Sequence, residues 1–145
     1  MQAVYRYYAW LIWIAVIVQI GLSGWGAFTV SNDTEEGTVD GSAFEDAFGD
    51  NFELHSALGF FILVGALAFI LIALGARVGR RRVLLVAGLF GLLFVQMILA
   101  WIGSEVPVLG VLHPINAVVL AGYSWWIAST AWKGETRMER VAGGP

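Results

Sequence analysis

The chain alternates between four long apolar runs and short polar segments. The runs cover residues 7–30, 54–76, 83–103 and 108–132. Each is near or above the about 20 residues that a helix needs to cross the hydrocarbon core of a bilayer. Within lipid, a helix satisfies all its backbone polar groups internally. The pattern therefore predicts an all-α membrane protein, a bundle of four transmembrane helices in one domain.

Composition agrees with this interpretation. Hydrophobic residues make up 59% of the chain and charged residues 13%, and mean hydropathy is +0.76. The first run is too long, and too rich in Trp and Tyr, for a signal peptide, so we expect a retained helix. The sequence has no cysteine. This excludes disulfides, cysteine-ligated zinc, iron–sulfur clusters and thioether-attached haem.

Charge predicts the orientation of the helices. Every basic residue lies at the same end of the expected bundle: Arg6, Arg77, Arg80, Arg81, Arg82, Lys133, Arg137 and Arg140. The segments at the other end hold only acidic charges: Asp33, Glu35, Glu36, Asp40, Glu45, Asp46, Asp50, Glu53 and Glu105. Because basic residues are retained on the cytoplasmic side, we expect a multi-pass protein of the cell membrane with both termini in the cytoplasm.

The segment 31–53 is the longest stretch outside the apolar runs, and we expect an acidic outer loop. Its first half is rich in Gly, Thr and Asp, which predicts a flexible connection. In its second half, Phe44, Phe48 and Phe52 recur every four residues and would share one face of a helix. That helix could be interfacial, or an early start of the second spanning helix. A lid over a site near the outer surface is the alternative.

The only two histidines, His55 and His113, each lie near the outer end of a spanning helix. The second and fourth helices run in the same direction. His55 precedes Arg77 by 22 residues and His113 precedes Lys133 by 20, which correspond to roughly 33 and 30 Å of helix. The two side chains should therefore lie at nearly equal depth in the outer leaflet.

A short pattern recurs in both halves of the chain. "VQIGLSGW" with Gln19 and Trp25 precedes "LHSALGFF", and "VQMILAW" with Gln96 and Trp101 precedes "LHPINAVV". We interpret this as two copies of a two-helix hairpin, related by an axis along the membrane normal. Such an axis would bring His55 and His113 to equivalent positions facing each other.

Two facing imidazoles could ligate a haem iron, bind a metal ion or hydrogen-bond to helix ends. Zinc and copper sites usually take three or more protein ligands, and the expected helices offer no third histidine, cysteine or carboxylate. A porphyrin supplies four nitrogens itself. We therefore favour one b-type haem with His55 and His113 as iron ligands. The alternative is a pair of interfacial histidines near lipid headgroups.

Other residues complete the predicted haem site. Gly59 and Ala117 lie one turn below the histidines and leave room for a flat ring, although small residues also serve helix packing. No basic residue is available for the propionates on the outer side, so they would need backbone amides, Ser, Asn, Trp N–H groups or water, and Trp25 and Trp101 are included in the predicted site. Pro114 suits the first turn of a helix or a kink after Pro107, in which case the Gly110 carbonyl would lose its partner and Asn116 or water could satisfy nearby polar groups.

Gln19 and Gln96 are expected a turn and a half to two turns deeper than the histidines. Interhelical hydrogen bonding is the favoured role. A contact to a quinone or to a haem edge is the alternative.

The quoted motifs, with "FELHSALGFFI", "GRRR" and "LGVLHPINAVVL", resemble a family of small four-helix prokaryotic membrane proteins of unassigned function. The arrangement is also similar to one four-helix half of haem A synthase. That resemblance implies a haem held by His55 and His113. Haem A synthases have eight helices and a functional glutamate in the helical region, whereas here we expect no acid inside a helix. The resemblance therefore implies haem binding and not the synthase chemistry.

The sequence thus favours electron transfer or haem handling over catalysis, since both axial positions of the iron would be filled. A basic redox carrier such as a c-type cytochrome could bind the acidic loop, and the chain could form an oligomer. Nothing in the sequence indicates nucleic-acid binding. The alternatives are a cofactor-free accessory or scaffold subunit and a small quinone- or lipid-binding protein.

Overall fold

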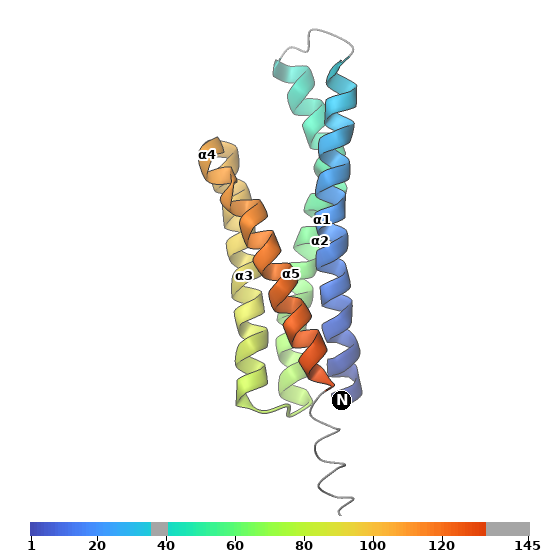
Figure 1. Ribbon diagram of the computed structural model, residues 1–145, viewed down its shortest axis with the longest axis vertical. Coiled ribbons are helices and arrows are strands. Elements are labelled where there is room, and N and C mark those ends of the chain that lie inside the picture. Colours follow the sequence, from blue (N-terminus) through green and yellow to red (C-terminus); the bar gives the residue numbers. More distant parts are fainter. Residues whose placement is uncertain (36–40, 133–145) are drawn as a thin grey trace, which may run out of the picture.

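The computed structural model describes residues 1–35 and 41–132, and for residues 33–35 and 41–44 it describes the backbone alone. The described chain is almost entirely helical (Figure 1). Its helices are α1 (Gln2–Glu35), α2 (Gly41–Gly75), α3 (Arg80–Glu105), the single turn α4 (Pro107–Gly110) and α5 (Leu112–Ala131). Four of the spans are long and apolar enough to cross a membrane. The predicted all-α membrane bundle is confirmed.

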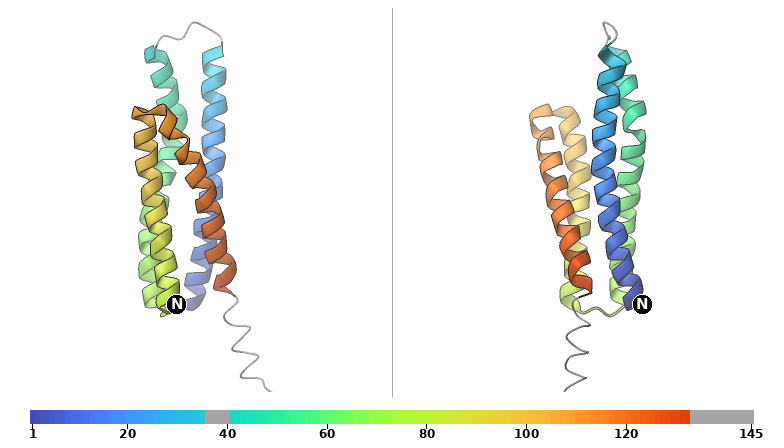
Figure 2. Two further views of the ribbon diagram at one scale, coloured as in Figure 1. Left: turned by 60° about the vertical axis from the view of Figure 1, so that its left-hand side comes forward. Right: turned by 45° about the vertical axis from the view of Figure 1, so that its right-hand side comes forward.

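The four long helices form two antiparallel hairpins, α1–α2 and α3–α5. Among the described residues α1 contacts α2 and α5, and α3 contacts α2 and α5, so that α2 and α5 lie diagonally across the bundle. Figure 2 shows that the hairpins lie close together at the end that holds the N-terminus and diverge toward the other end. There, α1 and α2 extend beyond the turn that joins α3 to α5.

The prediction of a loop over 31–53 is wrong for most of that segment. The helix α1 continues to Glu35, and α2 begins at Gly41. Asp50 and Glu53 therefore lie within α2, and the expectation that no acid lies inside a helix is wrong. Phe48 and Phe52 stack in α2 with ring centroids 4.4 Å apart, which confirms an early start of the second helix. Both helices extend beyond their apolar runs, and they remain packed against each other there. A Cβ on Gly26 would lie 2.9 Å from the Asn51 carbonyl oxygen, so glycine permits this close approach.

Some predictions fall outside the described residues. These are the placements of Glu36, Asp40, Lys133, Arg137 and Arg140 and of the Phe44 side chain. The fourth predicted span, 108–132, is divided in the structure. Pro107 begins the short helix α4, and Pro114 lies in the first turn of α5, where a proline costs no helical hydrogen bond. The predicted first-turn position of Pro114 is thus confirmed.

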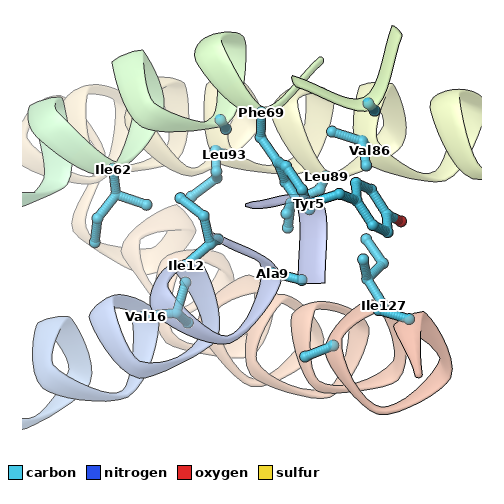
Figure 3. Close-up of a cluster of buried hydrophobic side chains, with 14 of the residues drawn as sticks. Tyr5, Ala9, Ile12, Val16, Ile62, Phe69, Val86, Leu89, Leu93 and Ile127 are labelled. Carbon is cyan, nitrogen blue, oxygen red and sulfur yellow. The ribbon is translucent and has the colours of Figure 1, made fainter. Parts of the chain in front are cut away.

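The core lies in the half of the bundle where the hairpins meet. Figure 3 shows side chains from all four long helices converging on one another, including Phe69, Leu89 and Ile127. These three are almost completely buried. Alanines at positions 9, 66, 73, 128 and 131 are buried with them. Small residues at such positions let helix backbones approach closely, which drives helix association in membranes.

The core repeats between the hairpins. Gln96 follows Gln19 by 77 positions and His113 follows His55 by 58, and these two offsets relate α1 to α3 and α2 to α5. Seven pairs obey them with both members buried: Ala9/Val86, Ile12/Leu89, Val16/Leu93, Ile62/Leu120, Ala66/Ser124, Phe69/Ile127 and Ala73/Ala131. The predicted repeat of two hairpins is therefore confirmed by the packing.

The turn that follows α3 depends on a contact between two glycines. A Cβ on Gly103 would lie 2.8 Å from the Cα of Gly110, a backbone atom that cannot move aside alone. We expect Gly103→Ala to lower the free energy of unfolding by about 1–3 kcal/mol, a usual cost of overpacking. The midpoint of thermal unfolding in detergent measures this. Gly91→Ala in the same helix is the control, since its Cβ would have no described heavy atom within 4 Å. Equal midpoints for the two variants would contradict the prediction.

Candidate functional site

The two histidines face each other across the bundle. His55 lies on α2 and His113 on α5, the diagonal pair of helices that run in the same direction. Their ring centroids are 6.3 Å apart and their planes are inclined by 57°. The prediction that they lie at one depth and face each other is confirmed.

Each histidine is held by a glutamine on the other helix of its own hairpin. The Gln19 Nε2 donates to the His55 carbonyl oxygen at 2.7 Å, and the His55 Nδ1 lies 3.1 Å from the Gln19 carbonyl oxygen. The second hairpin repeats both contacts: the Gln96 Nε2 donates to the His113 carbonyl oxygen at 3.0 Å, and the His113 Nδ1 lies 3.1 Å from the Gln96 carbonyl oxygen. In each hairpin, therefore, the glutamine side chain contacts the histidine main chain, and the histidine side chain contacts the glutamine main chain.

This pattern fixes the hydrogen positions. A backbone carbonyl oxygen only accepts hydrogen bonds, so each Nδ1 carries the hydrogen and donates it. In the neutral ring the Nε2 then keeps its lone pair. Ligating histidines commonly use one nitrogen for the metal and donate the other N–H to a carbonyl, which sets the orientation of the ring. With Nδ1 as the donor, the neutral rings of His55 and His113 would both have this arrangement.

The depth predicted for Gln19 and Gln96 is wrong. Both lie at the level of the histidines, because each exchanges hydrogen bonds with its histidine. The error comes from placing antiparallel helices by the ends of their apolar runs. The register is set instead by packing, and α1 continues outward beyond its apolar run. The favoured role of the glutamines, interhelical hydrogen bonding, is confirmed.

Asn116 supports the site in one hairpin only. Its Nδ2 donates to the Gln96 Oε1 at 2.7 Å and to the Leu92 carbonyl oxygen at 3.1 Å. It does not serve the Gly110 carbonyl, for which the sequence suggested it. Leu58 occupies the equivalent position of the first hairpin. The Gln19 Oε1 is consequently buried and has no hydrogen-bond partner in the described structure.

A cavity of about 360 Å³ lies between the histidines and the helices around them. Its lining contains nine residues from each hairpin, and the offsets of the repeat relate all of them in pairs: Val16/Leu93, Gln19/Gln96, Ile20/Met97, Ser23/Ala100, His55/His113, Ser56/Pro114, Gly59/Ala117, Phe60/Val118 and Ile62/Leu120. The cavity therefore has the same twofold symmetry as the core. Gly59 and Ala117 line it, as the sequence predicted.

Trp25 and Trp101 do not line the cavity. Their side chains are 61% and 69% exposed on the surface of the bundle, so their predicted place in the site is corrected. The cause is helical geometry. Ser23 and Ala100 follow the glutamines by four residues and line the cavity, whereas the tryptophans follow by six and five residues. At about 100° per residue these positions face elsewhere.

The described residues contain no group of three or more His, Cys, Asp or Glu that could hold a metal ion. The site offers two imidazole nitrogens and an apolar cavity. It can therefore complete the coordination of a metal that brings most of its own ligands.

Comparison with known proteins gives one match. The sequence model of a family of unknown function (DUF6220) matches residues 41–104, which comprise α2 and almost all of α3. This region contains His55 and Gln96 and ends before His113. No curated protein and no solved structure matches the chain.

Replacing Asn116 tests the support of the second hairpin. Asn116→Leu places there the residue found at position 58 and leaves the Gln96 Oε1 buried without its donor. We expect a loss of about 1–3 kcal/mol in the free energy of unfolding, the cost of a buried polar atom left unsatisfied. Thermal unfolding in detergent measures it. An unchanged midpoint would show that the contact to Gln96 adds nothing to stability.

Proposed function

We propose that this chain is a membrane-embedded b-type haem protein in which His55 and His113 ligate the iron from opposite faces. The observation that carries the proposal is the histidine pair itself. Both rings donate Nδ1–H to a carbonyl and keep the Nε2 lone pair, on either side of one apolar cavity. Haem suits a site with only two protein ligands, because the porphyrin supplies the other four.

The spacing of the rings supports this. Two metal–nitrogen bonds of about 2 Å each, with about 1 Å from each nitrogen to its ring centre, separate two axial imidazole centres by about 6 Å. The observed separation of the centroids is 6.3 Å. The observed separation therefore matches the spacing that two axial imidazoles on a common iron require.

The cavity supports a flat apolar ligand. Its volume of about 360 Å³ lies within the range of ligand sites in proteins. Phe60 and Met97, on α2 and α3, line it and are also exposed on the bundle surface, and so are Ile20 and Val118 on α1 and α5. The cavity thus reaches the surface between the hairpins on both sides. A macrocycle wider than the bundle interior can extend there into lipid.

The role we propose is electron transfer or haem handling. A bound haem supplies one-electron redox chemistry, and two histidine ligands leave its iron no free position for a substrate. One haem near one side of the membrane cannot carry electrons across about 30 Å of hydrocarbon. The donor or acceptor should therefore meet the protein at the outer end of the bundle.

The outer part of α2 supports a basic redox protein as that partner. Glu45, Asp46, Asp50 and Glu53 are all exposed there, and complementary charge would guide a cationic protein to this end. Phe48 is also exposed; it stacks on Phe52, whose ring lies 5.9 Å from that of His55. A continuous series of ring contacts thus leads from this acidic surface to the histidines.

Absorption spectroscopy of the purified protein tests the proposal. We expect a low-spin b-type spectrum in the reduced state, with about one haem per chain by pyridine haemochrome. His55→Ala and His113→Ala should each abolish the spectrum or turn it high-spin, because each removes one axial ligand. A protein that stays colourless when haem is supplied during expression would contradict the proposal and favour a cofactor-free scaffold subunit.

Trp25→Phe and Trp101→Phe are the matched controls, since both residues lie outside the cavity. Both variants should keep the wild-type spectrum and haem content. A loss of haem in either would show that the bound state differs from the site described above.

We further propose that the bundle lies in the cell membrane with both termini in the cytoplasm, as the distribution of basic residues supports. The absence of cysteine makes single-cysteine labelling direct. In intact cells a membrane-impermeant maleimide should modify Glu45→Cys, whereas Arg80→Cys should react only after permeabilisation. The reverse pattern would contradict this orientation.

A further inference from the structure

Two adjacent positions at which the hairpins differ bear on one atom beside the cavity. The first hairpin has Leu58 and Gly59 where the second has Asn116 and Ala117. Both differences concern the amide of Gln19. Leu58 offers this amide no donor, and Gly59 permits the close approach of the amide, since a Cβ there would lie 2.9 Å from the Gln19 Nε2.

The result is a single unsatisfied oxygen. The Gln96 Oε1 accepts from Asn116, whereas the Gln19 Oε1 is buried without a partner in the described structure. Its identity as the oxygen is fixed, because the other end of the amide donates to the His55 carbonyl. A buried acceptor without a donor is costly. Gln19 lines the ligand cavity, so a donor on the ligand can satisfy this oxygen once the amide turns toward the cavity.

A haem has one kind of group that can be this donor. Its carboxyl side chains donate a hydrogen bond only when they are protonated. The chain has no Lys or Arg between positions 7 and 76 or between 83 and 132, so no basic side chain from these segments can stabilise a carboxylate beside the cavity. In surroundings of low dielectric constant and without a cation, a carboxyl group favours its neutral form.

We propose that the Gln19 Oε1 accepts a hydrogen bond from a protonated carboxyl group of the bound haem. This inference rests on the haem-binding function proposed above and adds how the ligand is oriented. The two histidines and the two glutamines are related by the twofold axis and cannot by themselves tell one edge of the macrocycle from the other. Gln19 makes the distinction, because, of the two glutamine amide oxygens, only its Oε1 lacks a donor in the described structure.

The test combines two ligands with two proteins. Haem and its dimethyl ester, which lacks the O–H donors, are titrated into the apoprotein in detergent and followed by absorption. In the wild type we expect the ester to bind roughly three- to tenfold more weakly, the usual effect of one neutral hydrogen bond. Leu58→Asn supplies the donor that Asn116 gives the other hairpin. This variant should weaken the binding of haem and leave that of the ester unchanged, so that the ratio of the ester's dissociation constant to that of haem falls to near one.

Two further variants make the result specific. Leu58→Ile changes the same position without adding a donor and should keep the wild-type ratio. Gly59→Ala introduces a Cβ that crowds the Gln19 amide. This variant should also lower the ratio of the ester's dissociation constant to that of haem, and it replaces Leu58→Asn in the test if that variant does not fold. A low-spin spectrum in each complex shows that the protein is folded and that both histidines ligate the iron.

The outcomes separate the two proposals. Low-spin complexes with equal affinities for haem and ester in the wild type would overturn the role of Gln19 and leave haem binding intact. A preference for haem that is the same in the wild type, Leu58→Asn and Gly59→Ala would also overturn it, since the bulk of the ester would then be the cause. A failure of both ligands to give a low-spin spectrum would overturn haem binding, and the inference with it.

Discussion

The site depends on a hydrogen-bond exchange between neighbouring helices. In each hairpin a glutamine side chain donates to a histidine main chain, and the histidine side chain donates to the glutamine main chain. These hydrogen bonds set the register of the two helices and hold the imidazole. Because Nδ1 is used in them, Nε2 is the ring nitrogen left for a ligand. The diagonal placement of α2 and α5 then turns two local motifs into one shared site.

Much of this could be predicted from the sequence. The four apolar runs, the clustering of basic residues and the recurrence of Gln and His were sufficient for the fold, the repeat and the facing of His55 and His113. Gly59 and Ala117 were also found, because helical spacing alone places them on the histidine face. These features follow from the helical periodicity of the apolar residues and from the Gln and His motifs that recur in the two halves of the sequence.

Other features depend on contacts between helices, which a single sequence does not reveal. The outer parts of α1 and α2 are too polar to be recognised by hydropathy, yet they remain helical where the two helices pack, for example at Gly26. The depth of the glutamines required the register of the hairpin. The tryptophans were misplaced because their recurrence is out of step by one residue. That difference is small in a sequence comparison but rotates a side chain by about 100° on a helix.

The similarity of the two hairpins suggests how the chain arose. Each hairpin holds its own histidine through its own glutamine, supplies half of the residues that line the cavity and contributes to the core. Two identical two-helix chains, paired about the same axis, would present two histidines to each other in the same way. Duplication and fusion of the gene for such a homodimer would account for the present layout. After fusion the two halves are free to diverge, and Leu58 with Gly59, opposite Asn116 with Ala117, is a divergence that no homodimer could carry on one side alone.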